Sequence, residues 1–414
     1  MDAEALLDVA VREAGDRIRA ALAMRFRDLD MAEEAFGFAA LRAVETWRRD
    51  GAPRDPAAWL YAVARRRAFD LGRRAQVRQR AVHDAPEPPP DPETILMAAF
   101  EPIPDERLRL IFICCHPALA PEARIALTLR TLCGLSVERI ARAWLTTEVA
   151  MQQRLTRAKG KIRDAAIRFE IPEPDQWPER LEAVLATLEI AYAQAYEDAA
   201  GLSDAADLAR ETLRLSGLLA ELLPDEPEVL GLAAMIRLAE SRRPARLDDL
   251  GAMTPLSEQD VDLWDAALIA EAAGLLRRAA DLGCSGPYQL MATIHAVHAA
   301  RRETGATAWA DIVTLYDILL AVRPSAVAEV NRAVALAEAE GAEQGLTALA
   351  AIDAQIGERA RLADWLPYQA ARAGLCAKAG LQAEAADALR RALALHPAPA
   401  ERLFLQRRLA DLGA

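Results

Sequence analysis

Polar and basic side chains between residues 152 and 161 have the chemistry needed to read double-stranded DNA. Glutamine amides and arginine guanidinium groups bond to base edges in the major groove, and arginine and lysine bind phosphate oxygens. The residues concerned are Gln152, Gln153, Arg154, Thr156, Arg157, Lys159 and Lys161. The stretch from Arg124 to Arg163 holds nine basic and two acidic residues, which suits a phosphate-lined groove. We therefore predict that this stretch contacts DNA.

Two short helices joined by a turn would present these side chains. Ser136 is a good N-cap for a first helix ending near residues 143–145, and Thr147 is a good N-cap for a second. On the second helix an apolar stripe recurs at steps of four, three and four, formed by Met151, Leu155, Ala158 and Ile162. The pattern predicts a helix-turn-helix with a buried stripe and a polar face. The alternative is an ordinary amphipathic hairpin with a solvated basic face.

A second basic cluster lies earlier in the chain, where residues 65–80 hold seven arginines and one aspartate. Pro56 indicates the start of the helix that carries this cluster, because proline is favoured at the first helical position. Trp59 and Tyr61 precede the arginines, and aromatic rings beside cations suit unstacked single-stranded bases. The alternative is that both aromatic residues are core residues beside a solvated face.

Composition indicates an all-α protein of two or three domains. The chain has 414 residues, is 53% hydrophobic and carries a net charge of −12. Strand signals are nearly absent, and no apolar run is long enough to cross a bilayer, so we expect a cytoplasmic protein with no membrane partner. Residues 1–170 hold 28 basic and 25 acidic residues, whereas the remainder holds 22 and 37. A nucleic-acid module joined to an acidic module fits this contrast, with the proline-rich acidic segment 81–104 as a linker.

No residue group predicts catalysis, a metal or a cofactor. Cys114, Cys115 and His116 suggest zinc, with Cys133 as a further ligand, but adjacent cysteines lack the usual ligand gap. Buried thiols are the favoured interpretation, because the five cysteines are odd in number and mostly isolated, which argues against a disulfide framework. His295 and His298 have no third ligand nearby in the sequence. The chain also lacks a phosphate-cradling glycine loop and a Gly-x-Ser-x-Gly elbow, so we expect no enzyme.

Two DNA-facing helical modules joined by an acidic linker resemble the extracytoplasmic-function (ECF) sigma factors of bacterial RNA polymerase. The resemblance covers about residues 5–165. In the first module it rests on Pro56, Trp59, Leu60, Ala64, Arg65, Asp70, Arg73 and Arg74. In the second it rests on Leu135, Ser136, Ile140, Ala141, Met151, Arg154, Leu155, Arg157, Ala158 and Lys159.

The resemblance implies that residues 1–80 form sigma region 2 and residues 105–170 form region 4. The partners would be RNA polymerase core enzyme and promoter DNA, with the −35 element bound as duplex and the −10 element as single strand. Core contact would involve Glu33, Glu34 and Leu41. The −10 element would meet Arg54, Trp59, Arg65, Arg66, Arg73 and Arg74. The −35 element would meet the polar and basic side chains between residues 152 and 161 that are named above.

Two positions depart from the family pattern. Gly37 and Phe38 stand where a Gln-Glu pair is usual, which leaves the details of polymerase contact open. Arg66 stands where asparagine is common, so the base preference at −10 can differ.

Residues 180–414 show degenerate internal repeats of a tetratricopeptide (TPR)-like kind. Three segments end in a proline, at Pro224, Pro324 and Pro397. The clearest copy carries Gly380, Ala385, Leu389 and Ala392 before Pro397. One group of ECF sigma factors has a C-terminal helical extension of about this size, so the resemblance implies a module that regulates the sigma domains in cis or binds a protein partner. A generic helical bundle is the alternative.

The leading hypothesis is promoter-specific transcription initiation. A stand-alone helix-turn-helix regulator with a TPR-like sensor is a competing class, and a repeat-based scaffold with a vestigial DNA module is a third. Dependence of promoter binding on polymerase discriminates among them.

Overall fold

The computed structural model describes residues 3–79, 106–143, 146–165, 167–169, 172, 175–197, 203–283, 285–356 and 365–413. The predicted linker, residues 81–104, lies outside the described residues. Every regular element in the described ranges is a helix, apart from one isolated β-bridge between Leu247 and Met253. The prediction of an all-α fold is therefore confirmed. The chain divides into two compact units, Met1–Ala191 and Tyr192–Ala414.

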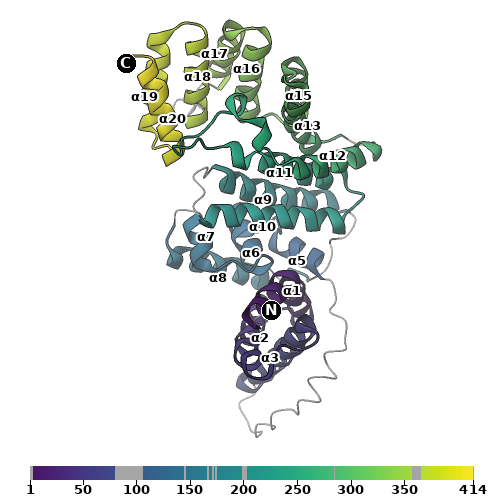
Figure 1. The fold of residues 1–414 in the computed structure, drawn as a ribbon. Coiled ribbons are helices and arrows are strands. Elements are labelled where there is room, and N and C mark those ends of the chain that lie inside the picture. Colours follow the sequence, from purple (N-terminus) through teal and green to yellow (C-terminus); the bar gives the residue numbers. More distant parts are fainter. Residues whose placement is uncertain are drawn as a thin grey trace. The chain divides into compact units, whose positions relative to one another are not determined.

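The first unit begins with three long helices that pack on one another (Figure 1). They are α1 (Ala3–Phe26), α2 (Leu29–Asp50) and α3 (Pro56–Gln79). Asp28 caps α2 by accepting a hydrogen bond from the Met31 amide at 3.0 Å, and Asp55 caps α3 by accepting one from the Ala58 amide at 2.9 Å. The core between the helices is formed by Ile18, Leu22, Ala32, Ala39, Ala43, Trp47, Leu60 and Ala64, all almost fully buried. Because many of these residues are alanines, the three helices approach closely.

Four shorter helices follow in the same unit. They are α5 (Arg107–Cys114), α6 (Pro121–Thr131), α7 (Val137–Ala143) and α8 (Glu148–Asp164). Pro121 begins α6, where its missing N–H has no partner to lose. Helix α9 (Trp177–Glu197) starts against α5, because the Arg180 guanidinium donates to the Phe112 carbonyl at 2.6 Å and Trp177 packs on the Phe112 ring. The boundary between the two compact units falls inside α9.

Cys114 and Cys115 belong to the core of this region. Both thiols are free and almost fully buried, and Cys115 Sγ lies 3.4 Å from Thr128 Oγ1. Burial raises the pKa of each thiol, which keeps both protonated. Within the described residues, no three histidine, cysteine or acidic side chains are grouped closely enough to hold a metal ion. Cys284 lies outside the described residues.

The second unit is built from helices that pack mainly on their neighbours in sequence (Figure 1). The helices are α10 (Ser203–Leu222), α11 (Pro227–Ser241), α12 (Ala266–Asp281), α13 (Pro287–Ala299), α14 (Arg301–Thr304), α15 (Trp309–Val322), α16 (Ala326–Glu340), α17 (Ala342–Ile356), α18 (Leu366–Lys378), α19 (Gln382–Ala394) and α20 (Pro399–Asp411). Three 3₁₀ turns lie between α11 and α12, at Arg243–Ala245, Leu256–Glu258 and Val261–Leu263.

Small residues set the spacing of the last hairpins. Gly345 brings α17 so close to α16 that an added Cβ would lie 2.7 Å from the Ala333 carbonyl oxygen. On α19, Ala385, Leu389 and Ala392 are buried, as the repeat pattern predicts. The prolines expected to close helices follow α10, α15 and α19. None of the helices in the described part of the chain is long and apolar enough to span a membrane.

Candidate nucleic-acid interface

The predicted helix-turn-helix is formed by α7 and α8. Ser136 Oγ accepts a hydrogen bond from the Arg139 amide at 3.2 Å, and Thr147 Oγ1 accepts one from the Ala150 amide at 3.2 Å. Glu148 lies in the first turn of α8, where the helix dipole favours a carboxylate. The buried residues of α8 are Met151, Leu155, Ala158 and Ile162, which confirms the predicted stripe.

The opposite side of α8 is polar and open. Gln152, Gln153, Thr156, Arg157 and Lys161 are exposed, and Arg154 is half-buried. Arg157 Nη2 donates to Gln153 Oε1 at 3.3 Å, so these two side chains form a hydrogen-bonded pair one turn apart. Glutamine and arginine are both side-chain types that bond to base edges in the major groove. Base contact by these residues stays a prediction.

Lys159 has a different environment from the other basic residues of α8. Its side chain is 12% exposed, and Nζ lies 2.7 Å from Asp30 Oδ1 and 3.0 Å from Glu33 Oε2 on α2. Arg130 Nε lies 3.6 Å from the same Glu33 oxygen. Burial lowers the pKa of Lys159, but Glu33 and Asp30 raise it by more, so the net shift is upward from 10.5 and the ammonium stays charged. Lys159 and Glu33 are thus held by each other in this arrangement, Lys159 also by Asp30 and Glu33 also by Arg130.

Buried polar contacts also join the α1–α3 bundle to the α5–α8 group. Arg19 of α1 donates from Nε to the Thr131 carbonyl at 2.9 Å and from Nη2 to the Leu132 carbonyl at 3.1 Å. Its guanidinium also lies over the Phe36 ring, 4.9 Å from the centroid. Arg107 Nη1 lies 3.5 Å from the buried carboxylate of Asp16. The α1–α3 bundle and the α5–α8 group are therefore bonded together in this arrangement, which we call closed.

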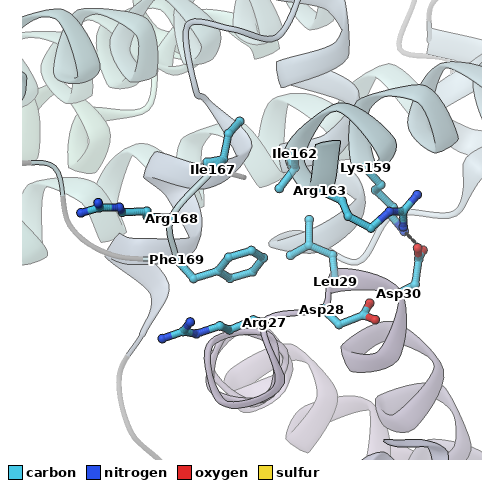
Figure 2. Close-up of a pocket in the computed structure, with 10 residues that line it drawn as sticks. All are labelled: Arg27, Asp28, Leu29, Asp30, Lys159, Ile162, Arg163, Ile167, Arg168 and Phe169. Carbon is cyan, nitrogen blue, oxygen red and sulfur yellow. Dashed lines mark hydrogen bonds and ion pairs between the residues drawn. The ribbon is translucent and has the colours of Figure 1, made fainter. Parts of the chain in front are cut away.

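A pocket of about 500 Å³ lies along this contact, between the turn joining α1 to α2 and the end of α8. Figure 2 shows Leu29, Ile162 and Phe169 directed toward one another, with Lys159 reaching Asp30 at one side. Arg27 adopts a left-handed backbone conformation, with φ of 52°, in the turn beside the pocket. Apolar side chains thus lie along this contact beside the ion pairs.

The arginine-rich segment predicted to meet the −10 element lies on α3. Arg65 and Arg66 are half-buried, Arg73 is exposed, and Arg54 is exposed just before the helix. Arg74 belongs to α3, but its side chain lies outside the described part of the structure. Arg67, absent from the predicted set, forms an ion pair with Glu34 at 2.8 Å and lies 4.8 Å from the centroid of the Phe38 ring.

The aromatic residues of α3 differ in how much they are buried. Tyr61 is 3% exposed, so it belongs to the core. Trp59 is half-buried, and its ring meets Trp47 edge to face with centroids 5.5 Å apart. Tyr61 cannot stack on a base without a rearrangement of the bundle, whereas part of Trp59 remains open to solvent. Contact of Trp59 with DNA stays a prediction.

The residues predicted to contact polymerase lie on α2 in three different settings. Glu33 is held by Lys159 and Arg130, Glu34 is paired with Arg67, and Leu41 is 68% exposed. Phe38 is also exposed, at 38%. An exposed leucine beside an exposed phenylalanine is an apolar surface of the kind that protein partners use. The sequence singled out Phe38 only as a departure from the family pattern.

Comparisons with known proteins match the helix-turn-helix part of this site, but not α2 or α3, to a recognised module. Residues 109–162 match the family described as sigma-70, region 4, and residues 180–280 match a family of unknown function, DUF6596. The chain is 40% identical to the uncharacterized protein R00370 of Rhizobium meliloti (strain 1021), over 99% of this chain and 96% of the relative. No solved structure matches the chain.

Proposed function

The chain belongs to the family of the Rhizobium meliloti protein R00370 and carries a sigma-70 region 4, and on that premise we propose that it is a sigma factor of the ECF type. Region 4 gives it a DNA-binding role in transcription. The observation that carries the proposal is the polar, exposed face of α8, which lies within the matched residues and in the same compact unit as the arginine-rich α3. The protein would work in the cytoplasm, bound to RNA polymerase core enzyme.

In this proposal α8 reads the −35 element in the major groove. Gln153 and Arg157 face the bases, with Gln152 and Thr156 beside them, because these four side chains are exposed and lie on one side of the helix. Arg154 and Lys161 bind phosphates. Glutamine suits adenine and arginine suits guanine, since each pairing forms two hydrogen bonds.

The −10 element is assigned to α3. Arg65, Arg66, Arg73 and Arg74 attract the phosphate backbone, Arg54 approaches it from the preceding loop, and the open part of Trp59 faces an unstacked base. Leu41 and the neighbouring Phe38 provide an apolar contact for polymerase on α2, next to the Glu34 carboxylate. The second unit is of the TPR-like class in this proposal, since its hairpins use buried alanines at the repeat positions.

The closed arrangement has to open on a promoter. The −35 and −10 elements are centred roughly 25 base pairs apart, about 85 Å along B-DNA at roughly 34 Å per turn. A helix is only about 10 Å across. Since Lys159 of α8 bonds directly to α2, and α3 packs on α2, α8 and α3 cannot reach both elements at once. We assign the closed arrangement to the protein before it meets polymerase and DNA.

Polymerase dependence tests the proposed function. Promoters are first found by mapping transcription starts after overproduction of the full chain. We expect the full chain to bind such a promoter tightly, and to protect both the −35 and −10 elements, only when core enzyme is added. Tight binding of the full chain alone at one operator-like site, unchanged by core enzyme, would show a stand-alone regulator instead.

The acidic part of the chain is proposed to regulate the sigma domains in cis. Residues beyond 170 hold 22 basic and 37 acidic residues, a balance of −15, and an acidic module tethered to basic DNA-binding faces can mask them or contact polymerase. We expect a chain that ends after Glu197 to differ from the full chain in promoter-specific transcription by several-fold. Equal output together with equal affinity for core enzyme contradicts regulation in cis.

A further inference from the structure

Within the part of the second unit that the structure describes, one buried arginine has no acidic partner. Arg242 follows α11 directly and is 3% exposed. Its Nη2 lies 2.7 Å from His295 Nδ1 on α13. Nε and Nη1 are also buried, and neither has a hydrogen-bond partner among the described residues. A guanidinium has five N–H donors, so most of the hydrogen-bonding capacity of Arg242 is unused.

The two histidines and the tyrosine near Arg242 are neutral at physiological pH, and the charged neighbour Arg246 is itself a cation. Since arginine only donates, His295 Nδ1 must accept, which requires an uncharged ring. Burial, and then the charge of Arg242, lower the pKa of His295 well below its usual value and that of His298 to about 4. Burial raises the pKa of Tyr316 on α15 to about 12. None of these groups can balance the positive charge.

The other buried or half-buried arginines of this region differ from Arg242, because each has a partner of its own. Arg243 Nε lies 2.5 Å from Glu240 Oε1. Arg246 donates to the Tyr196 carbonyl and lies over the Tyr196 ring. Arg301 donates to the carbonyls of Leu256, Ser257 and Gln259. These three arginines therefore interact with a carboxylate, an aromatic ring or backbone carbonyls. Arg242 is the one in this group whose partner is only a neutral imidazole.

An uncompensated buried charge is costly in free energy, and an anion that enters the site removes that cost. Guanidinium groups bind carboxylates and phosphates through short, charge-assisted hydrogen bonds. One guanidinium among neutral groups balances one negative charge, whereas phosphate sites usually gather several arginines. The net charge of −15 beyond residue 170 also opposes a multiply charged anion.

We propose that Arg242, with His295, His298 and Tyr316 around it, forms a binding site for a singly charged carboxylate. The carboxylate can belong to a free organic acid or to a protein segment, as a side chain or chain end. His295, His298 and Tyr316 are half-buried, so part of the cluster is open to solvent. Binding requires these side chains to move, because the free nitrogens of Arg242 are buried.

Thermal unfolding of the full chain tests the site. The probes are acetate and benzoate at matched ionic strength, and tetra-alanine with either a free carboxylate or an amide at its end. We expect at least one carboxylate to raise the unfolding temperature of the second unit by about 2 °C or more, because a ligand that binds only the folded state stabilises it. A shift with the free acids assigns a small-molecule ligand, and a shift only with the acid form of the peptide assigns a protein segment. No shift with any carboxylate overturns the proposal, as does an equal or larger shift with inorganic phosphate.

Substitutions at Arg242 separate a ligand site from a structural arginine. We expect Arg242→Met to abolish the carboxylate shift and, without ligand, to unfold at the same or a higher temperature than the natural chain, because it removes an unbalanced buried charge. Arg242→Gln is the second variant, since its amide can still donate to His295 while the charge is lost. Arg237→Met is the matched control on α11, because Arg237 is paired with Glu271 at 2.9 Å, and it should keep the shift. If both Arg242 variants unfold at clearly lower temperatures without ligand, the charge is balanced within the protein and the proposal is wrong.

Discussion

Replacing Gln153 and Arg157 together by alanine is expected to lower transcription from the protein's own promoters by about 30-fold or more. A good base contact contributes about 1–3 kcal/mol of discrimination, and about 1.4 kcal/mol corresponds to a factor of ten. The two side chains bond to each other at 3.3 Å and are exposed on α8, so their removal should leave the buried stripe of that helix intact. The measurement is single-round transcription by reconstituted holoenzyme on promoters with intact and altered −35 elements.

The preference for intact over altered −35 elements is the decisive measurement for this prediction. The double variant should lose its preference for the intact −35 element while keeping its affinity for core enzyme and its dependence on the −10 element. Arg163→Ala is the matched control, because Arg163 is a highly exposed arginine at the end of the same helix. This variant should lower transcription from all the promoters by the same small factor. A double variant that still distinguishes intact from altered −35 elements would show that α8 does not read them.

Replacing Arg19 by methionine is expected to open the closed arrangement and to strengthen binding to core enzyme. The Arg19 side chain bonds to two carbonyl oxygens at the end of α6, and hydrogen bonds to charged groups contribute about 1.5–3 kcal/mol each. Arg19 belongs to no predicted DNA or polymerase contact, so its loss should act on core affinity through the closed arrangement, with a smaller loss of bundle stability from the Phe36 contact. We expect affinity for core enzyme to rise about tenfold, and hydrogen exchange in α6 and α8 of the free protein to increase.

Arg25→Met is the control for this effect. Arg25 also lies on α1, but its guanidinium packs over Phe69 of α3, inside the first helical bundle, 5.5 Å from the ring centroid. The control should lose some stability of that bundle and leave exchange in α6 and α8 unchanged. If Arg19→Met leaves both core affinity and hydrogen exchange as they are in the natural chain, the closed arrangement does not limit assembly with polymerase.

Local features of the site could be predicted from sequence because they depend on neighbours a few residues away. The caps at Ser136 and Thr147 and the stripe from Met151 to Ile162 follow from rules that operate within one or two turns of helix. The structure confirms them. The sequence contains no comparable signal for the partners of Lys159, since Asp30 and Glu33 lie more than 120 positions away along the chain.

The same distinction applies to Arg19 and Arg242. Arg19 reaches carbonyls 112 and 113 positions away, and a carbonyl has no sequence signature at all. Arg242, Arg243 and Arg246 form a short basic run that contains one proline. In the sequence, such a run looks like part of a solvated surface. Only the packing of α11 against α13 shows that this arginine is enclosed with a histidine.

The ion pair between Lys159 and Glu33 joins two side chains that are each predicted to serve a different molecule. In the proposed function, polymerase competes with Lys159 for Glu33, and a promoter phosphate competes with Glu33 for Lys159. Whichever molecule arrives first releases the side chain that the other requires, so each should bind more tightly in the presence of the other. Thermodynamic linkage makes this gain the same in both directions. One lysine on α8 would thus make polymerase and promoter mutual effectors, and the free protein would discriminate against either one alone.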